Sequence, residues 1–181
     1  MRKSGVPTPA TRRGRNSAER PSRSVAAPSF VPNAGLRIVL PYVTISRTAR
    51  PTTAAIIEDE EHVRVFLRLL LKQVGIDQVW EAGDGRKGLD VVAQHQPELV
   101  LLDINLPVMS GLEVLTNLTA AYPAIPVIMV SSQSAMSVVL ETVKRGAAAY
   151  ILKQSPPQEA LKMLCEAIDN LESTEGDDNH H

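Results

Sequence analysis

Short apolar runs alternate with longer amphipathic stretches between residues 54 and 171. Runs of four or five apolar residues, such as Leu99–Leu102, are typical of strands that are buried on both faces of a sheet. Between these runs, apolar residues recur every three or four positions, which is the period of a helix with one buried face. The pattern therefore predicts five strands alternating with five helices. The predicted strands cover residues 54–57, 78–82, 99–102, 126–130 and 149–152.

Cap residues mark the ends of several predicted helices. Gly75 and Gly146 predict C-terminal caps, because glycine adopts a left-handed conformation at little cost. Ser155, Pro156 and Gln158 predict the start of the last helix, with the serine as N-cap, the proline in first position and the glutamine completing a capping box. Because helices connect successive strands, the pattern predicts a doubly wound α/β fold with a parallel sheet covered on both faces.

The charges divide the chain into two unlike segments. The formal net charge is -1, yet residues 1–50 carry ten Lys and Arg against the single acid Glu19, and residues 51–181 carry nine against 19 acids. The first segment is also rich in Ser, Pro and Ala and lacks a sustained apolar period. We therefore expect a disordered basic extension over residues 1–50, one domain over 51–172 and a disordered acidic tail over 173–181.

Three uses of the basic extension remain open. It is compatible with an arm that touches nucleic acid or an anionic membrane, with a targeting peptide, or with an extension upstream of the true start. It carries no recognisable DNA-binding motif. Its longest apolar stretch, LRIVLPYVTI from Leu36, is too short to span a bilayer and is interrupted by Arg37 and Pro41.

Polar side chains follow four of the five predicted strands. Glu58 and Asp59 follow the first, Asp103 the third, Ser131 the fourth and Lys153 the fifth. The carboxyl ends of parallel strands meet at one edge of a sheet, where ligands bind in such folds. Three acids, one hydroxyl and one cation are therefore expected to converge there, which favours a functional site over a coincidence of helix caps.

Two neighbouring acids and the single cysteine have structural explanations. Glu60 and Glu61 fall in the first turn of a predicted helix, where acidic side chains suit the helix dipole. Cys165 lies beside the apolar stripe of the last helix and is expected to be an unreactive core thiol. A lone cysteine excludes an internal disulfide and is compatible with a reducing cytoplasm.

The sequence resembles the receiver domains of two-component response regulators. The resemblance runs from Ala54 to about Leu171 and rests on four motifs in family order and at family spacing: IIEDE, LLDINLPVMSG, VIMVSS and GAAAYILK. It implies a flavodoxin-like five-stranded sheet with strand order 2-1-3-4-5.

The resemblance also implies roles for individual residues. Asp103 would accept a phosphoryl group, Lys153 and Ser131 would bind its oxygens, and Tyr150 would be the aromatic side chain that turns inward as Ser131 moves. Mg2+ would be held by Glu58, Asp59, Asp103 and the backbone carbonyl of Asn105, because this ion prefers oxygen ligands.

This sequence departs from the common family pattern at three positions. Glu58 stands where Asp is more frequent, and Ser131 where Thr is commoner; both substitutions preserve the chemistry. Lys153 is followed by Gln154, where many members have a proline with a cis bond. We expect a trans bond here, since a cis bond before a residue other than proline would cost about 3–4 kcal/mol.

The implied partners are a sensor histidine kinase or a histidine phosphotransfer protein, in the cytoplasm and without a membrane span. A downstream partner would read a face made of residues 136–144, Tyr150 and residues 155–171, unless the chain pairs with itself there. We expect a stand-alone receiver that is not an enzyme on external substrates. Two other classes stay open: a magnesium-dependent phosphatase, against which Asn105 argues because a second catalytic acid is usual there, and a pseudo-receiver that only binds partners.

Overall fold

The computed structural model describes residues 49–172. The predicted disorder of the acidic tail, and of all but the last two residues of the basic extension, therefore falls outside the described residues. The strands are β1 (Thr53–Ile57), β2 (Gln78–Ala82), β3 (Leu99–Leu102), β4 (Val127–Ser131) and β5 (Ala149–Leu152). The helices are α1 (Glu61–Gln73), α2 (Gly85–His95), α3 (Gly111–Ala121), α4 (Met136–Lys144) and α5 (Pro157–Glu172).

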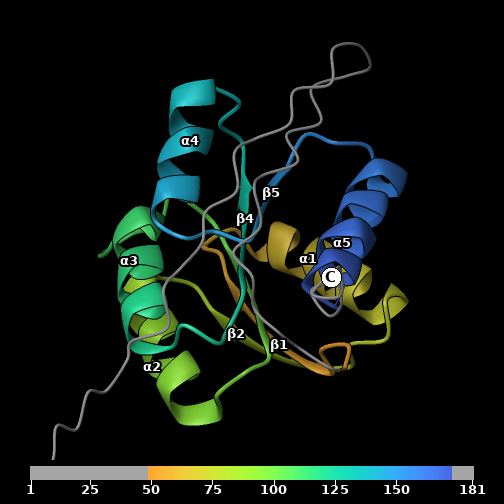
Figure 1. Ribbon diagram of the computed structural model, residues 1–181, viewed down its shortest axis with the longest axis horizontal. Helices are drawn as coiled ribbons and strands as arrows, with labels where there is room; N and C mark the ends of the chain where they lie inside the picture. The colour runs from red at the N-terminus through yellow and green to blue at the C-terminus, as the bar shows by residue number, and fades with distance from the viewer. Residues whose placement is uncertain (1–48, 173–181) are drawn as a thin grey trace, which may run out of the picture.

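The five strands form one parallel sheet in the order β2-β1-β3-β4-β5, which confirms the predicted fold. Helices α2, α3 and α4 cover one face, and α1 and α5 cover the other (Figure 1). The strand order reverses direction between β1 and β3, so the crevice for a ligand is expected above these two strands.

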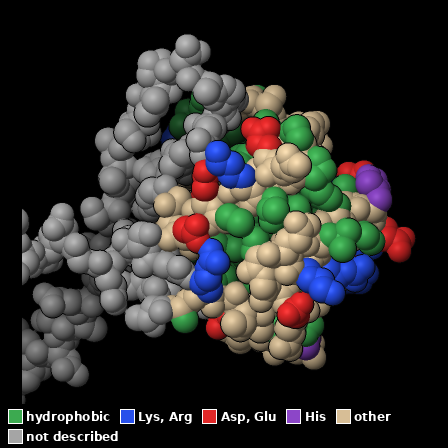
Figure 2. All heavy atoms as spheres, turned by 90° about the vertical axis from the view of Figure 1, so that its right-hand side faces the viewer, with side chains coloured by type: hydrophobic (Ala, Val, Ile, Leu, Met, Phe, Trp, Pro, Cys, Tyr) green, Lys and Arg blue, Asp and Glu red, His purple; other side chains and the backbone are tan. Residues whose placement is uncertain are grey.

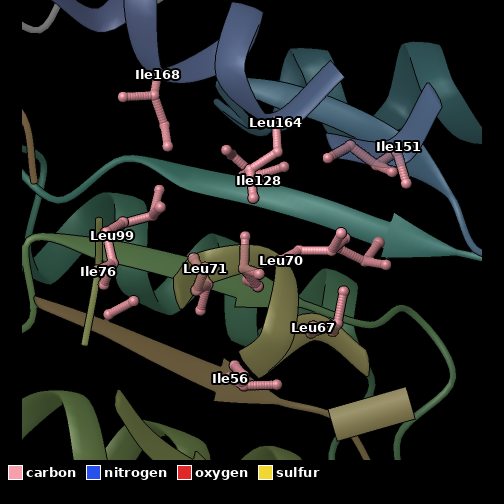
Figure 3. Packing of buried hydrophobic residues seen from close by; sticks show 14 of the residues in the cluster. Ile56, Leu67, Leu70, Leu71, Ile76, Leu99, Ile128, Ile151, Leu164 and Ile168 are labelled. Atoms are coloured by element: carbon pink, nitrogen blue, oxygen red, sulfur yellow. The ribbon is translucent and has the colours of Figure 1, made fainter. Parts of the chain in front are cut away.

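Each face of the sheet has its own apolar core. On one face, alternate residues of the strands pack with α2, α3 and α4 around Leu102 and Leu115. On the other, Leu70 and Leu71 of α1 and Leu164 of α5 point toward the sheet (Figure 3). Burial on both faces explains why β3 is a continuous run of four apolar residues with no alternation.

Glycines end two helices as predicted. Gly75 follows α1 with a φ of 88°, and Gly146 follows α4 with a φ of 93°. The chain after α1 folds back so that the amide of Ile76 donates to the carbonyl of Leu71 at 2.9 Å. These left-handed residues turn the chain toward β2 and β5.

The predicted start of the last helix is wrong by one residue. α5 begins at Pro157, and the amide of Ala160 donates to the carbonyl of Pro156 at 2.9 Å, so Pro156 occupies the cap position and Ser155 lies outside the helix. The reason is the double proline, since a residue that precedes proline is disfavoured in the helical conformation. The Lys153–Gln154 bond before this turn is trans, as expected.

In the described part of the chain, no helix combines the length and the apolar character needed to cross a membrane.

Gly111 leaves no room for a side chain at the carboxyl edge of the sheet. A Cβ atom there would lie 1.9 Å from the carbonyl oxygen of Asp103 and 2.8 Å from Cα of Ile104, both backbone atoms. We expect Gly111→Ala to lower the free energy of unfolding by about 2 kcal/mol, because the loop after β3 must move. Urea denaturation measures this.

Gly83→Ala is the matched control for Gly111→Ala. A Cβ atom at Gly83 would meet only the Nη1 atom of Arg64, at 3.7 Å, which is ordinary contact. Its effect is expected to stay within about 0.5 kcal/mol. Equal effects of the two substitutions would contradict the close approach at Gly111.

Candidate functional site

The loops that follow β1, β3, β4 and β5 meet at the carboxyl edge of the sheet. The amide of Asp103 donates to the carbonyl of Ile57 at 2.9 Å, which places the end of β3 beside the end of β1. The amide of Lys153 donates to the carbonyl of Ser131 at 3.0 Å, which does the same for β5 and β4. Backbone pairing therefore delivers the predicted side chains to one place.

Asp103 is the buried carboxylate at the centre of this edge. Its residue is only 2% exposed, and its Oδ1 atom has no hydrogen-bond partner among the described residues. Its Oδ2 atom lies 3.2 Å from Nζ of Lys153. Buried carboxylate oxygens are normally paired, so an unpaired one indicates a place for a ligand.

Lys153 joins the acids of the site into one cluster. Its Nζ atom lies 2.7 Å from Oε2 and 2.9 Å from Oε1 of Glu58, nearer than to Asp103, and 3.4 Å from Oε1 of Glu60. Glu58 is fully buried, while the Lys153 side chain is 10% exposed. The lysine thus compensates two buried carboxylates at once, and its strongest contact is with Glu58.

Burial and the contact with Lys153 shift the pKa values of Glu58 and Asp103 in opposite directions. Burial raises the pKa of Glu58, and the Asp103 charge adds to that rise, while the hydrogen bond from Lys153 opposes it. Burial likewise raises the pKa of Asp103, against the opposing charge of Lys153. For Lys153 burial acts to lower the pKa, but the hydrogen bond to Glu58 and the charge of Asp103 outweigh it and leave the pKa raised.

The donor set fits a divalent cation that prefers oxygen ligands. Glu58, Asp59 and Glu60 can each offer a carboxylate oxygen, and these oxygens lie within 4.8 Å of one another. The unpaired Oδ1 of Asp103 provides a further oxygen at the same edge. Acids without such an ion repel one another, and Mg2+ is bound in proteins by carboxylates together with waters.

Ser131, the last residue of β4, belongs to a hydrogen-bonded chain across the loops. Its Oγ atom accepts from the amide of Gln133 at 3.2 Å. The Gln133 carbonyl accepts from the hydroxyl of Tyr150 at 2.7 Å, and its side-chain Nε2 donates to Oδ1 of Asn105 at 2.9 Å. One residue therefore connects the loop after β3, the hydroxyl at the end of β4 and the aromatic side chain of β5.

Tyr150 already lies inward. It is 5% exposed, and burial raises the pKa of its phenol. Its movement together with Ser131 remains a prediction.

The sequence did not predict that Glu60 and Gln133 take part in this site. Glu60 is the N-cap residue of α1, yet its side chain makes no capping hydrogen bond and instead contacts Lys153 and Nε2 of His62. Its position directly after Glu58 and Asp59 was a signal, but the helix dipole explained it equally well. For Gln133 the sequence offers no signal, because its partner Asn105 is 28 residues away.

Val108 adopts a strained conformation in the loop after β3. Its φ is 70°, which a β-branched residue rarely adopts, and its side chain is 85% exposed, so packing does not compensate the strain. We expect Val108→Gly to raise the free energy of unfolding by about 1 kcal/mol, as measured by urea denaturation. Val108→Ala is the control and should recover only part of this gain, because alanine keeps a Cβ; an equal gain would attribute the effect to apolar exposure instead.

Comparison with known families and curated proteins places this geometry among signalling modules. A family model described as the response regulator receiver domain matches residues 54–165. The chain is 33% identical over 118 residues to the nitrate/nitrite response regulator protein NarL of Escherichia coli K12, across 65% of this chain and 55% of NarL. It is 30% identical over 109 residues to the chemotaxis protein CheY of Listeria monocytogenes, across 60% of this chain and 92% of CheY. It thus spans about half of NarL but nearly all of CheY.

Solved structures of response regulators share this fold. The fold superposes on a CheY-like response regulator receiver domain protein from Methanospirillum hungatei with a TM-score of 0.60 and 26% identity, covering 67% of this chain and 96% of that one. A DNA-binding response regulator of the LuxR family from Staphylococcus aureus matches with a TM-score of 0.59 and 26% identity, covering 64% of this chain and 98% of that one.

Proposed function

The chain belongs to the family of response regulator receiver domains, and on that premise we propose that Asp103 accepts a phosphoryl group from a sensor histidine kinase or a histidine phosphotransfer protein. The proposal rests on the contacts of the Asp103 carboxylate. One of its oxygens is buried without a hydrogen-bond partner among the described residues, and the other lies 3.2 Å from Nζ of Lys153. A carboxylate with a free lone pair beside a cation is suited to attack phosphorus.

The transfer forms one bond and breaks one. An electron pair of a carboxylate oxygen of Asp103 attacks phosphorus, the bond from phosphorus to the donor imidazole nitrogen breaks, and that nitrogen keeps the electron pair. Lys153 offsets the charge of one phosphoryl oxygen. Ser131, whose oxygen accepts from the amide of Gln133, donates its own hydroxyl hydrogen to another.

The carboxylates Glu58, Asp59 and Asp103, with the backbone carbonyl of Asn105, are proposed to hold Mg2+. When bound, the ion supplies positive charge that offsets the repulsion between the carboxylates and the phosphoryl oxygens. Glu58 has a second task, because it holds Lys153 at 2.7 Å.

The signal is proposed to leave the site through Gln133 and Tyr150. If Ser131 moves toward a phosphoryl oxygen, the amide bonded to it moves too, and the carbonyl of the same residue holds the hydroxyl of Tyr150 at 2.7 Å. Tyr150 and the adjoining helices α4 and α5 form the face that a downstream partner reads. Two side chains of α4, Met136 and Leu140, are 47% and 46% exposed there.

Acetyl phosphate and Mg2+ test the proposed function on the full chain. Intact mass spectrometry should show one phosphoryl adduct per chain, and peptide mapping should assign it to Asp103. Free phosphate should appear only slowly, at the rate at which the adduct decays. Sustained release over many turnovers would support a phosphatase, and no adduct at all would support a module that only binds partners.

A further inference from the structure

An apolar groove lies between α1 and α5, next to the site. Its cavity has a volume of about 380 Å³, within the range of about 300–1,000 Å³ that is typical of ligand pockets. The face that carries α1 and α5 shows hydrophobic side chains gathered at its centre, with charged side chains around them (Figure 2). The side chains that line an open cavity of this size lack the van der Waals contacts that a packed neighbour would give them.

Apolar side chains from both helices and from the sheet line the groove, and charged groups line one end. The walls include Val63, Phe66, Leu67, Ile151, Ala160 and Leu164. The charged end is formed by Glu60, His62 and Lys153. Its best occupant is therefore an extended apolar segment.

The chain itself holds such a segment close by. Residues 36–45 read LRIVLPYVTI, the longest apolar stretch outside the domain, and they belong to the 48 residues that precede the described part. In the described part, the guanidinium of Arg50 pairs with the carboxylate of Asp169 on α5. The extension therefore joins the domain beside one of the two helices that form the groove.

The distances allow this segment to reach the groove. Asp169 lies five residues after Leu164 and nine after Ala160, which corresponds to roughly 8 and 14 Å along α5. The five residues from Ile45 to Arg50 span up to about 17 Å when extended. The apolar stretch can thus begin at the groove and continue along it.

We propose that residues 36–45 bind in the groove between α1 and α5 of the same chain. Their apolar side chains fill the cavity. Glu60 and Lys153 line one end of the groove and also belong to the site, so the groove and the site are adjacent.

Hydrogen exchange of the full-length protein tests this proposal. The amides of residues 36–45 should exchange at least about tenfold more slowly than in an unstructured peptide of the same sequence. Val63→Glu places a charge in the wall of the groove and should abolish this protection. Val65→Glu is the matched control, because this valine lies on the same helix, is 40% exposed and does not line the groove; protection should persist.

A second set of variants changes the segment and leaves the groove intact. The pair Val39→Asp and Leu40→Asp should shift the methyl NMR signals of Leu67 and Leu164, whereas Val25→Asp with Val31→Asp, elsewhere in the extension, should leave them in place. Urea midpoints establish that each variant is folded.

Three results would overturn the proposal: full-speed exchange of residues 36–45, protection that survives Val63→Glu, or protection that depends on protein concentration, which would indicate a second copy of the chain. Protection is expected to be the same in Asp103→Asn. Failure of the phosphoryl-transfer proposal is therefore seen separately from failure of this one.

Discussion

Asp103→Asn is expected to abolish the phosphoryl adduct that acetyl phosphate and Mg2+ form on the wild-type chain. The amide has no anionic oxygen to attack phosphorus, while its size preserves the packing of a residue that is 2% exposed. Intact mass spectrometry at several incubation times measures the loss. Glu58 is also buried beside Lys153, but both of its carboxylate oxygens lie close to Nζ, at 2.7 and 2.9 Å, whereas Oδ1 of Asp103 makes no such contact among the described residues; the residual signal should therefore be close to zero.

Asp90→Asn is the control for this substitution. Asp90 is exposed on α2, away from the carboxyl edge, and its loss removes the same charge from the chain. The adduct should form at the wild-type rate. An adduct of unchanged yield in Asp103→Asn would assign the phosphoryl group to another residue and refute the proposed function.

Asp103→Asn should also change stability with a predictable sign. Burial raises the pKa of Asp103 in the folded chain, so between the ordinary value of 3.8 and the raised one the folded state binds more protons than the unfolded state. This group therefore contributes stability at low pH that is lost as pH rises. Asparagine does not ionise, so the variant keeps its stability as pH rises. Its free energy of unfolding should exceed that of the wild type at pH 7 but not at pH 3.

Lys153→Met is expected to lower the free energy of unfolding by about 3 kcal/mol at pH 7. It removes the cation that lies 2.7 Å from the fully buried Glu58 and 3.2 Å from Asp103, and leaves two carboxylates facing each other. Urea denaturation measures the loss. Without Lys153, the pKa values of both acids rise further, so the deficit should shrink as pH falls toward 4.

Two further variants isolate the charge effect. Lys162→Met changes an exposed lysine on α5 and should alter stability by less than about 0.5 kcal/mol. Adding Glu58→Gln to Lys153→Met removes the buried charge that lost its partner and should recover more than half of the deficit. A deficit that is independent of pH and unaffected by Glu58→Gln would indicate lost packing of the lysine stem instead.

Lys153→Met also tests the coupling between the site and the face around Tyr150. The phosphorylated variant should lack the change in Tyr150 that the phosphorylated wild type shows by NMR. A variant that still switches normally would remove Lys153 from the mechanism.

Local patterns predicted most of the fold because each depends on neighbours in sequence. The strands at residues 78–82, 99–102 and 149–152 have the predicted bounds, and Gly75 and Gly146 cap their helices as expected. The start of α5 was missed because two prolines compete for the first helical position, and only the second fits. The end of β4 lies at Ser131, one residue later than predicted, because its carbonyl still pairs with the amide of Lys153.

The sequence by itself determined the fold and the types of residue at the carboxyl edge, because periodicity and strand ends are local properties. It did not determine which carboxylate Lys153 pairs with, since Glu58 lies 95 residues away and both Glu58 and Asp103 compete for one cation. Both acids are buried, and tertiary structure decided the competition by distance: the Glu58 carboxylate lies 2.7 Å from Nζ, against 3.2 Å for Asp103. The same packing placed Glu60 beside the site and joined Asn105 to Tyr150 through Gln133. Such contacts depend on distances between strands, which no pattern along the chain encodes.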